Sequence, residues 1–493
     1  MQNKVVTEGY QLTPQQANIW LLQQADGSHA YMAQSAVLIE GEIVVETLKA
    51  AISEVVNRHE ILRTNFHLLP EMTLPLQVIG SDQVVEFREI DLNEEDPQEK
   101  HARFEELFRQ ETLHRFDLKR EPIARLSLFR LSISEMVLVT SLPAVCGDSR
   151  SLKNLFHEIA GAYAARLRDE EFSVQPVQYV DFAEWQKEAL EQEAVKDERW
   201  NGLNPHLSSA SPLMLGLERE GHAVAGPTGF GWLPNCVSVR LDDETTAKID
   251  RISSAHNVST GVFLLACWQI LVWRLTGRKD IKIDILCESR RIGGLREALG
   301  AFASFCPVQS HIEPDYQFIE MLEIVDQSIR SANKRLNHLL HQDGGIKENG
   351  RLAERVNAIG FEFEEWPIAV SAGSAKFTYW KQFVCLDRFK LKLGGYRKAD
   401  GITTEIQYDP ALFAEESIEL IKERYLRLIE SAVEDERALI GDYEGRRDGQ
   451  AKAHSYQTEK AMRGVGKDGA PPLIRAPRGG RRLYRSRSRD CGF

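Results

Sequence analysis

The sequence predicts a mixed α/β (α+β) fold built from two halves of similar size. The first observation is that segments with helical periodicity alternate along the whole chain with short apolar segments typical of strands. The second is length, because 493 residues, 43% of them hydrophobic, are too many for a single core. The third is a polar segment with two prolines and several glycines, residues 186–225, which we expect to be a linker between the halves.

We expect four parts along the chain. An N-terminal subdomain covers residues 1–185, the linker follows, a C-terminal subdomain covers 226–445, and a basic tail covers 446–493. The tail holds 13 Lys and Arg against 4 Asp and Glu, so the net charge of −12 comes from the residues before it. An acidic body repels nucleic acid and suits a small-molecule or protein-bound substrate.

The tail is rich in Arg, Gly, Pro and Ser and cannot bury enough apolar surface to fold, so we expect it to be disordered. Two interpretations of it are open. One is an RNA-binding or docking tail. The other, which we favour, is a shifted reading frame, because the composition changes abruptly after Tyr443.

Local patterns predict the elements of the first half. The predicted helices cover residues 18–24, 48–58, 99–112 and 149–166, and the predicted strands cover 66–69, 77–79, 123–131 and 136–141. Thr13 precedes Pro14 and is a suitable N-cap for the first helix. In the last of these helices, the apolar residues at positions 152, 155, 156, 159 and 163 fall on one face.

The second half shows the same mixture. We expect strands at residues 236–241, 281–286 and 358–365 and helices at 243–256 and 262–273. The last of these is the longest apolar run, and it is shorter than the roughly 20 residues that cross a bilayer, so we expect a buried helix and no membrane association. The N-terminus lacks the apolar core of a secretory signal. The seven cysteines include no CxxC pair, which favours neither a zinc site nor a disulfide framework and indicates a cytoplasmic protein with reduced thiols.

The loop between the strand at 136–141 and the helix after it is the leading candidate for a functional site, because loops at such junctions often carry chemistry. Asp148, at its end, is placed to cap the helix that starts at Ser149. Cys146 lies two residues before Asp148. Its thiolate would be a nucleophile or a base if the pKa were lowered; otherwise Cys146 is a small buried residue that fills the loop.

Two longer motifs point to a family. Residues 58–66 read RHEILRTNF and match the pattern RHExLRTxF in full, and residues 179–185 read YVDFAEW and match YxDFAxW. Residues 13–20 and 299–302 match two further motifs in part, with Ser304 where the second usually has Asn. In this order and spacing, the chain from about residue 10 to 445 resembles the condensation domains of nonribosomal peptide synthetases, which act in secondary metabolite biosynthesis.

The resemblance implies two chloramphenicol-acetyltransferase-like subdomains arranged in a V, with a tunnel between them. Peptidyl or acyl carrier proteins and other synthetase modules are the implied partners. They deliver substrates on 4′-phosphopantetheine, and the domain binds no cofactor or metal of its own. The implied reaction is acyl transfer: an acceptor amine attacks a donor thioester, which forms an amide.

The chain departs from the family at the HHxxxDG motif, which supplies the histidine that deprotonates or positions the amine. Pro143 and Ala144 stand at the two histidine positions, and Ser149 replaces the glycine. Alanine has no group that can take up a proton. A positioned base is worth about 10²–10⁴-fold in rate, whereas holding two reactants together supplies effective molarities of about 10⁵–10⁸ M.

The sequence is compatible with several functions. We expect a condensation-type domain with a degenerate active site, which forms amide bonds by holding both substrates. The alternative is a non-catalytic carrier-docking or interface domain that recruits a tailoring partner. A free acyl-CoA acyltransferase of the same superfamily is less favoured, because those enzymes also need the missing histidine.

The resemblance also assigns residues around the loop. Asp148 is expected to form an ion pair with Arg290 across the site and to hold the loop in shape. The substrate tunnel is expected to pass Ser141, Gly147 and Ser304.

Overall fold

The computed structural model describes most of residues 8–443. The gaps within this range are 28–29, 82–84, 95, 121–122, 173–174, 197–214, 220–231, 291–293 and 344–356. The described residues belong to one compact unit, Met1–Tyr443. The predicted basic tail, residues 446–493, lies outside the described residues, so both interpretations of it stay predictions.

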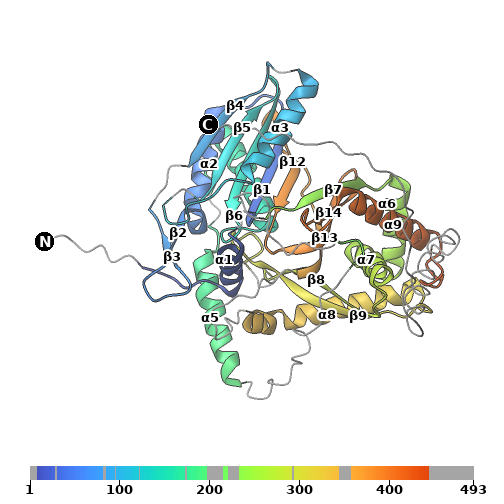
Figure 1. Ribbon diagram of the computed structural model, residues 1–493. Coiled ribbons are helices and arrows are strands. Elements are labelled where there is room, and N and C mark those ends of the chain that lie inside the picture. Colours follow the sequence, from blue (N-terminus) through green and yellow to red (C-terminus); the bar gives the residue numbers. More distant parts are fainter. Residues whose placement is uncertain are drawn as a thin grey trace, which may run out of the picture. The chain divides into compact units, whose positions relative to one another are not determined.

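A six-stranded sheet forms most of the first half, in the order β11-β12-β1-β6-β5-β4 (Figure 1). Its strands are β1 (Met32–Glu40), β4 (Glu86–Asp91), β5 (Arg125–Arg130), β6 (Glu135–Pro143), β11 (Val370–Ala372) and β12 (Ala375–Val384). Helices α2 (Val45–Arg58) and α4 (Ser149–Leu167) pack on one face, and α3 (Pro97–Glu111) packs on the other through Phe104 and Phe108. Strands β1, β5 and β6 are buried along most of their length, as expected for strands covered on both faces.

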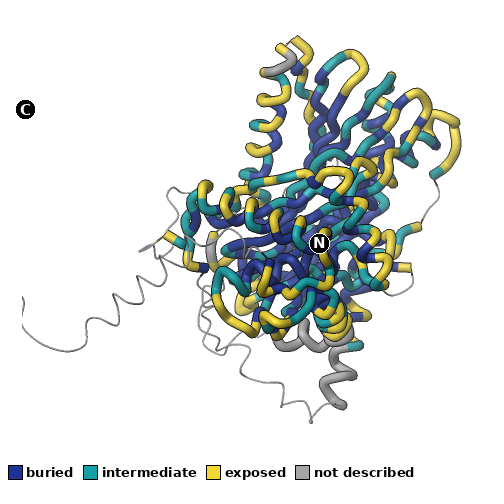
Figure 2. Tube along the Cα trace, turned by 90° about the vertical axis from the view of Figure 1, so that its right-hand side faces the viewer, coloured by how far each residue is buried: buried dark blue, intermediate teal, exposed yellow. Residues whose placement is uncertain are grey.

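The second sheet has the order β7-β14-β13-β10-β8-β9. Its strands are β7 (Asn235–Arg240), β8 (Asp280–Glu288), β9 (Ala303–His311), β10 (Asn357–Glu365), β13 (Phe389–Lys398) and β14 (Gly401–Tyr408). Its apolar face packs against helices α6 (Asp243–Ala255), α7 (Thr260–Thr276), α8 (Phe318–Asp343) and α9 (Glu415–Glu434). Burial alternates along β8 and β14, so the other face of this sheet is polar and only partly covered. Figure 2 shows the buried residues gathered where strands and helices meet.

Smaller elements lie beside the sheets. They are α1 (Pro14–Asp26), the short helix η1 (Glu60–Arg63), the hairpin of β2 (Thr64–His67) and β3 (Leu76–Ile79), and α5 (Tyr179–Lys196). Thr13 caps α1 as predicted, and the Thr13 backbone amide donates to Oε1 of Gln16, which completes a capping box.

Strand β12 comes from the second half of the chain but belongs to the first sheet. It pairs with β1, and the register brings Ala33 opposite Val384 and Glu40 opposite Lys376. Backbone hydrogen bonds therefore join the predicted subdomains 1–185 and 226–445, whose boundaries stay a prediction. The α/β class of the fold is confirmed, whereas β1 and β12 were not predicted from the sequence.

The expectation of an irregular linker over all of residues 186–225 was wrong at its start. Helix α5 continues to Lys196. The reason is local, because this stretch is rich in Glu, Ala, Gln and Lys, which are strong helix formers.

None of the described helices is by itself both long and apolar enough to span a bilayer, although α6 and α7 pass that test as a pair bent by 103°. Residues 261–272 of α7 are buried, as predicted for the longest apolar run. The six cysteines in the described part of the chain have free thiols.

Candidate active site

The site is built on the loop that joins β6 to α4. Strand β6 ends at Pro143, and the Cys146 amide donates to the Pro143 carbonyl at 2.8 Å, which closes a tight turn. Asp148 has an extended backbone and caps α4, because its side chain accepts the amide of Ser151. The side chains of Ala144, Cys146 and Asp148 are fully buried, so the loop is sealed inside the protein.

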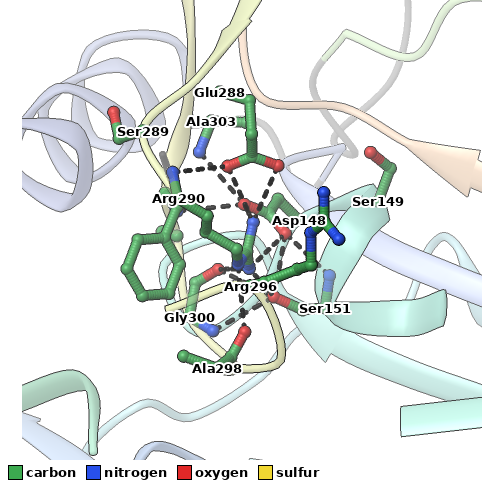
Figure 3. A network of polar contacts seen from close by, with 12 residues as sticks. Asp148, Ser149, Ser151, Glu288, Ser289, Arg290, Arg296, Ala298, Gly300 and Ala303 are labelled. Carbon is green, nitrogen blue, oxygen red and sulfur yellow. Dashed lines mark hydrogen bonds and ion pairs between the residues drawn. The ribbon is translucent and has the colours of Figure 1, made fainter. Parts of the chain in front are cut away.

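Arg290 lies across the site from Asp148 and binds it with both ends of its guanidinium. Nη1 donates to Oδ2 and Nη2 to Oδ1, each at 2.9 Å (Figure 3). Asp148 comes from the first half of the chain, and Arg290 follows β8 in the second. The two predicted residues are thus brought together, and Asp148 caps its helix as well.

The remaining hydrogen-bonding positions of Asp148 are also occupied. Oδ1 accepts the amide and the hydroxyl of Ser151, both at 2.8 Å, and Oδ2 accepts the amides of Phe302 and Ala303 at 3.0 Å. The guanidinium of Arg290 also lies 4.1 Å from the centre of the Phe302 ring. One carboxylate therefore fixes α4, the start of β9 and the segment after β8 against one another.

The electrostatics keep this ion pair charged. Burial alone would raise the pKa of Asp148, but Arg290 and the Ser151 hydrogen bonds outweigh it, so the pKa lies below its usual value. Burial likewise opposes the charge of Arg290, and Asp148 and Glu288 outweigh it and raise the pKa. Glu288 has a raised pKa, first because of burial and then because Asp148 is close.

Apart from Asp148, whose two oxygens are fully bonded, the loop offers no group for proton transfer. Ala144 has only a methyl group, and burial raises the pKa of the Cys146 thiol well above its usual value. A thiol in this state is neither a base nor a good nucleophile at neutral pH. The structure therefore favours the second interpretation of Cys146, a small buried residue that fills the loop.

The three residues expected to line a tunnel lie on different elements. Ser141 is buried in β6, opposite Gln34 of β1. Gly147 lies in the loop, where an added Cβ would come within 2.9 Å of the Leu142 side chain. Ser304 is on β9, opposite Cys287 of β8. Their place in a substrate tunnel remains a prediction.

A second set of charged side chains crosses between the halves near the same loop. The first residue of α4, Ser149, donates its hydroxyl to Oε1 of Glu364. Lys153, one turn later, lies 3.0 Å from Oε2 of Glu364, and Gln382 of β12 donates to the same oxygen at 2.9 Å. This cluster joins α4 and β12 to β10.

Next to it, on the same face of the second sheet, Glu362 pairs with Lys392 of β13 at 2.8 Å. Sequence reasoning missed both pairs. The one signal was the alternation of Phe and Glu over residues 361–364, which is typical of a strand with one polar face. Nothing in the sequence indicates that the partners of these glutamates are Lys153 and Lys392.

Comparison with known proteins gives a consistent picture. The family model described as the condensation domain matches residues 6–453. Surfactin synthase subunit 2 of Bacillus subtilis (strain 168) is 23% identical over 434 residues, which cover 86% of this chain and 12% of that protein. The dimodular nonribosomal peptide synthase of the same strain is 27% identical over 463 residues, with 87% and 18% covered. The chain thus spans less than a fifth of the length of these two relatives.

Solved structures share the fold. The condensation domain from the Monacolin K polyketide synthase MokA superposes with a TM-score of 0.75 at 21% identity, covering 88% of this chain and 99% of that one. The first condensation domain of the calcium-dependent antibiotic synthetase, in complex with substrate analogue 3a, gives 0.71 at 18% identity, with 88% and 98% covered. The X-domain in its complex with OxyB from teicoplanin biosynthesis gives 0.70 at 23% identity, with 89% and 96% covered.

Proposed function

Because the chain belongs to the condensation-domain family of nonribosomal peptide synthetases, we propose that it joins two carrier-bound substrates through an amide bond. Its partners are then carrier proteins and neighbouring synthetase modules, and its substrates are acyl and amino groups linked to 4′-phosphopantetheine. The relatives named above support this, because two of them are peptide synthetases and one solved structure is a condensation domain holding a substrate analogue.

The observation that carries the proposal is the complete Asp148–Arg290 ion pair. A buried charge pair is costly to assemble and strongly destabilising when one partner is lost. Here it is intact, with two backbone amides and Ser151 added, although both histidines are replaced. The geometry that shapes the loop is therefore kept, and holding the amine and the thioester together is the largest contribution available to this reaction.

A second function is favoured by a different observation. The loop is sealed, and its one titratable group besides Asp148, the Cys146 thiol, stays protonated. A protein with such a loop would bind carriers or a tailoring enzyme without forming a bond. The X-domain, which shares this fold, is known in a complex with OxyB.

The two functions are separated by one assay. The protein is mixed with an aminoacyl-loaded acceptor carrier and a panel of acyl- and aminoacyl-loaded donor carriers, and amide product on the acceptor is measured by intact-protein mass spectrometry. Product above the level of a reaction without the protein supports amide formation. Carrier binding by calorimetry without product supports the docking function, and neither binding nor product would contradict both.

A further inference from the structure

We propose that Glu362 accepts the proton of the attacking amine, in the role that an imidazole would have at position 144. This inference rests on the proposed amide-forming function and names the group that completes it. Glu362 lies two residues from Glu364, which contacts the loop through Ser149, and the two glutamates differ in their hydrogen bonds.

The position follows from contacts at both ends of the loop. At one end, Ser149 donates its hydroxyl to Glu364, two residues from Glu362 on the same face of β10. At the other end, Pro143 lies opposite Met32, whose carbonyl accepts the amide of Cys385 at 2.9 Å.

The charged partner of Glu362 is Lys392 of β13. Cys385 lies in the short segment between β12 and β13, and Lys392 of β13 bonds to Glu362. The loop is thus tied at Ser149 to β10, the strand that carries Glu362, and at Pro143, through Met32, to the segment that leads into β13, the strand that carries Lys392.

The hydrogen bonds separate the two glutamates. Both carboxylate oxygens of Glu364 have partners, because Ser149 binds Oε1 while Lys153 and Gln382 bind Oε2. Glu362 is bound at Oε1 by Lys392, and the described part of the chain makes no hydrogen bond to its Oε2. Both side chains are mostly buried, with 16% of Glu362 and 12% of Glu364 exposed, so the hydrogen bonds distinguish them and the exposure does not. Among the described residues, Oε2 of Glu362 thus has no hydrogen-bond partner and is left for a substrate amine, whereas both oxygens of Glu364 are already bonded.

The electrostatics point the same way. Burial raises the pKa of Glu362, with Lys392 opposing this and Glu364 adding to it. Burial acts in the same direction on Glu364, but Lys153 and the hydroxyl of Ser149 outweigh it and lower the pKa. Two adjacent carboxylates whose environments drive their pKa values apart form the pattern of an acid–base site. Glu364 stays ionised and holds the cluster, and Glu362 is the one that gains and loses a proton.

Other candidates near the loop fit less well. Cys146 is fully buried and protonated. Glu288 has a raised pKa too, but both of its oxygens accept from Nη1 of Arg290, at 2.9 and 3.0 Å. Protonation of Glu288 would weaken its bonds to the residue that holds Asp148, whereas protonation of Glu362 leaves Asp148 and Arg290 untouched.

The proposed step moves one proton from the amine to the thiol by way of Glu362. The amine nitrogen attacks the thioester carbonyl carbon, and the new C–N bond forms as one N–H proton passes to Oε2 of Glu362. The tetrahedral intermediate then expels the phosphopantetheine sulfur with its bonding electrons. Glu362 returns the proton to that thiolate. The products are the amide and a free carrier thiol, and Glu362 regains its starting charge without any oxidant or metal.

The test compares Glu362→Gln with Glu365→Gln in the same carrier assay. Both changes remove one carboxylate charge from β10, but Glu365 has an exposed side chain. We expect kcat for Glu362→Gln to fall by about 10²–10⁴-fold, the usual worth of a positioned base, with carrier binding unchanged. Glu365→Gln should match the wild-type protein. For Glu362→Ala, added formate should restore part of the rate, because a small carboxylate can occupy the vacated position.

Four outcomes decide the matter. Loss of rate in Glu362→Gln at an unchanged melting temperature, with formate rescue of Glu362→Ala, supports the inference. Wild-type rates in Glu362→Gln overturn it. If Glu362→Gln loses rate because it no longer folds, and formate does not rescue Glu362→Ala, Glu362 has a structural role. This result also overturns the inference. Absence of amide product in the wild-type protein overturns the proposed function and this inference together.

Discussion

Arg290 holds both carboxylate oxygens of Asp148 at 2.9 Å across 142 positions of sequence. Each partner is almost fully buried, so neither charge is solvated by water. The pair stabilises the protein only while both members are present, because an unpaired buried charge is far more costly than a surface one. It fastens the cap of α4 to the segment that follows β8, and it does so without the histidines that usually precede the aspartate.

The Asp148→Ala variant should therefore be strongly destabilised. Removing the carboxylate leaves Arg290 buried without its main partner and removes the cap of α4, and we expect a loss of about 3–5 kcal/mol in the free energy of unfolding. Urea unfolding followed by circular dichroism measures this. Asp243→Ala is the control, since the Asp243–Arg240 pair is exposed and worth about 1 kcal/mol or less. An unfolding free energy like that of the wild-type protein, with amide formation lost, would contradict the structural role of Asp148.

The same ion pair predicts how stability depends on pH. The pKa of Asp148 is lower in the folded protein than its ordinary value of 3.8. A depressed carboxyl pKa contributes stability that is complete above the ordinary value and is lost as the pH falls through the folded-state pKa. We expect the difference in unfolding free energy between the wild-type protein and Asp148→Asn to be constant from pH 7 to about 5 and to shrink below about pH 4. A difference that grew on acidification would show that the carboxyl is protonated in the folded state.

Cys146→Ala should leave amide formation within about twofold of the wild-type rate, because burial keeps the thiol protonated and away from substrates. Iodoacetamide should fail to label Cys146 in the folded protein and should label it after denaturation in urea, as peptide mass spectrometry would detect. Rapid labelling of the folded protein, or loss of product in a folded Cys146→Ala variant, would restore the thiol as a nucleophile or base.

The cluster around Glu364 gives a further prediction about stability. Lys153→Met removes the cation that pairs with Glu364 and should cost several kcal/mol, of the order found when one partner of a buried pair is lost. The double variant Lys153→Met with Glu364→Gln should recover a large part of that loss, since the uncompensated charge is then gone. Unfolding free energies of the two single variants and the double variant measure the coupling. Additive losses would mean that the two side chains act independently.

Local patterns in the sequence were sufficient for the parts of the fold that depend on nearby residues. The cap at Thr13 and the buried helix α7 depend on neighbours within a few positions, and the structure has both. Arg290 could be assigned to Asp148 because a family motif carries that pair. The pairing of β12 with β1 could not be predicted, because register between strands far apart in sequence is set by packing of the whole sheet.

The second cluster of the site was missed for a related reason. Ser149, Lys153, Gln382 and Glu364 come from three elements that meet only in the folded chain. No single segment has a composition that signals the cluster, since lone Lys and Glu residues are normally solvated. The sequence predicted the loop residues as a site. It could not predict their complete burial, which depends on the sheet and helix that cover them.

Restoring the family's histidine by Ala144→His should not restore fast chemistry. The methyl group of Ala144 has no exposed surface, and the turn that follows is closed by the bond from the Cys146 amide to the Pro143 carbonyl. An imidazole in this space would overpack the core, at a cost of about 1–3 kcal/mol or more. We expect a lower melting temperature and amide formation no faster than in the wild-type protein, whereas the control Ala144→Ser, with one added atom, should fold normally. A gain of about 10²-fold or more in the rate of Ala144→His, at an unchanged melting temperature, would contradict this prediction. It would mean that the loop opens towards the substrates and that Glu362 is not the proton acceptor.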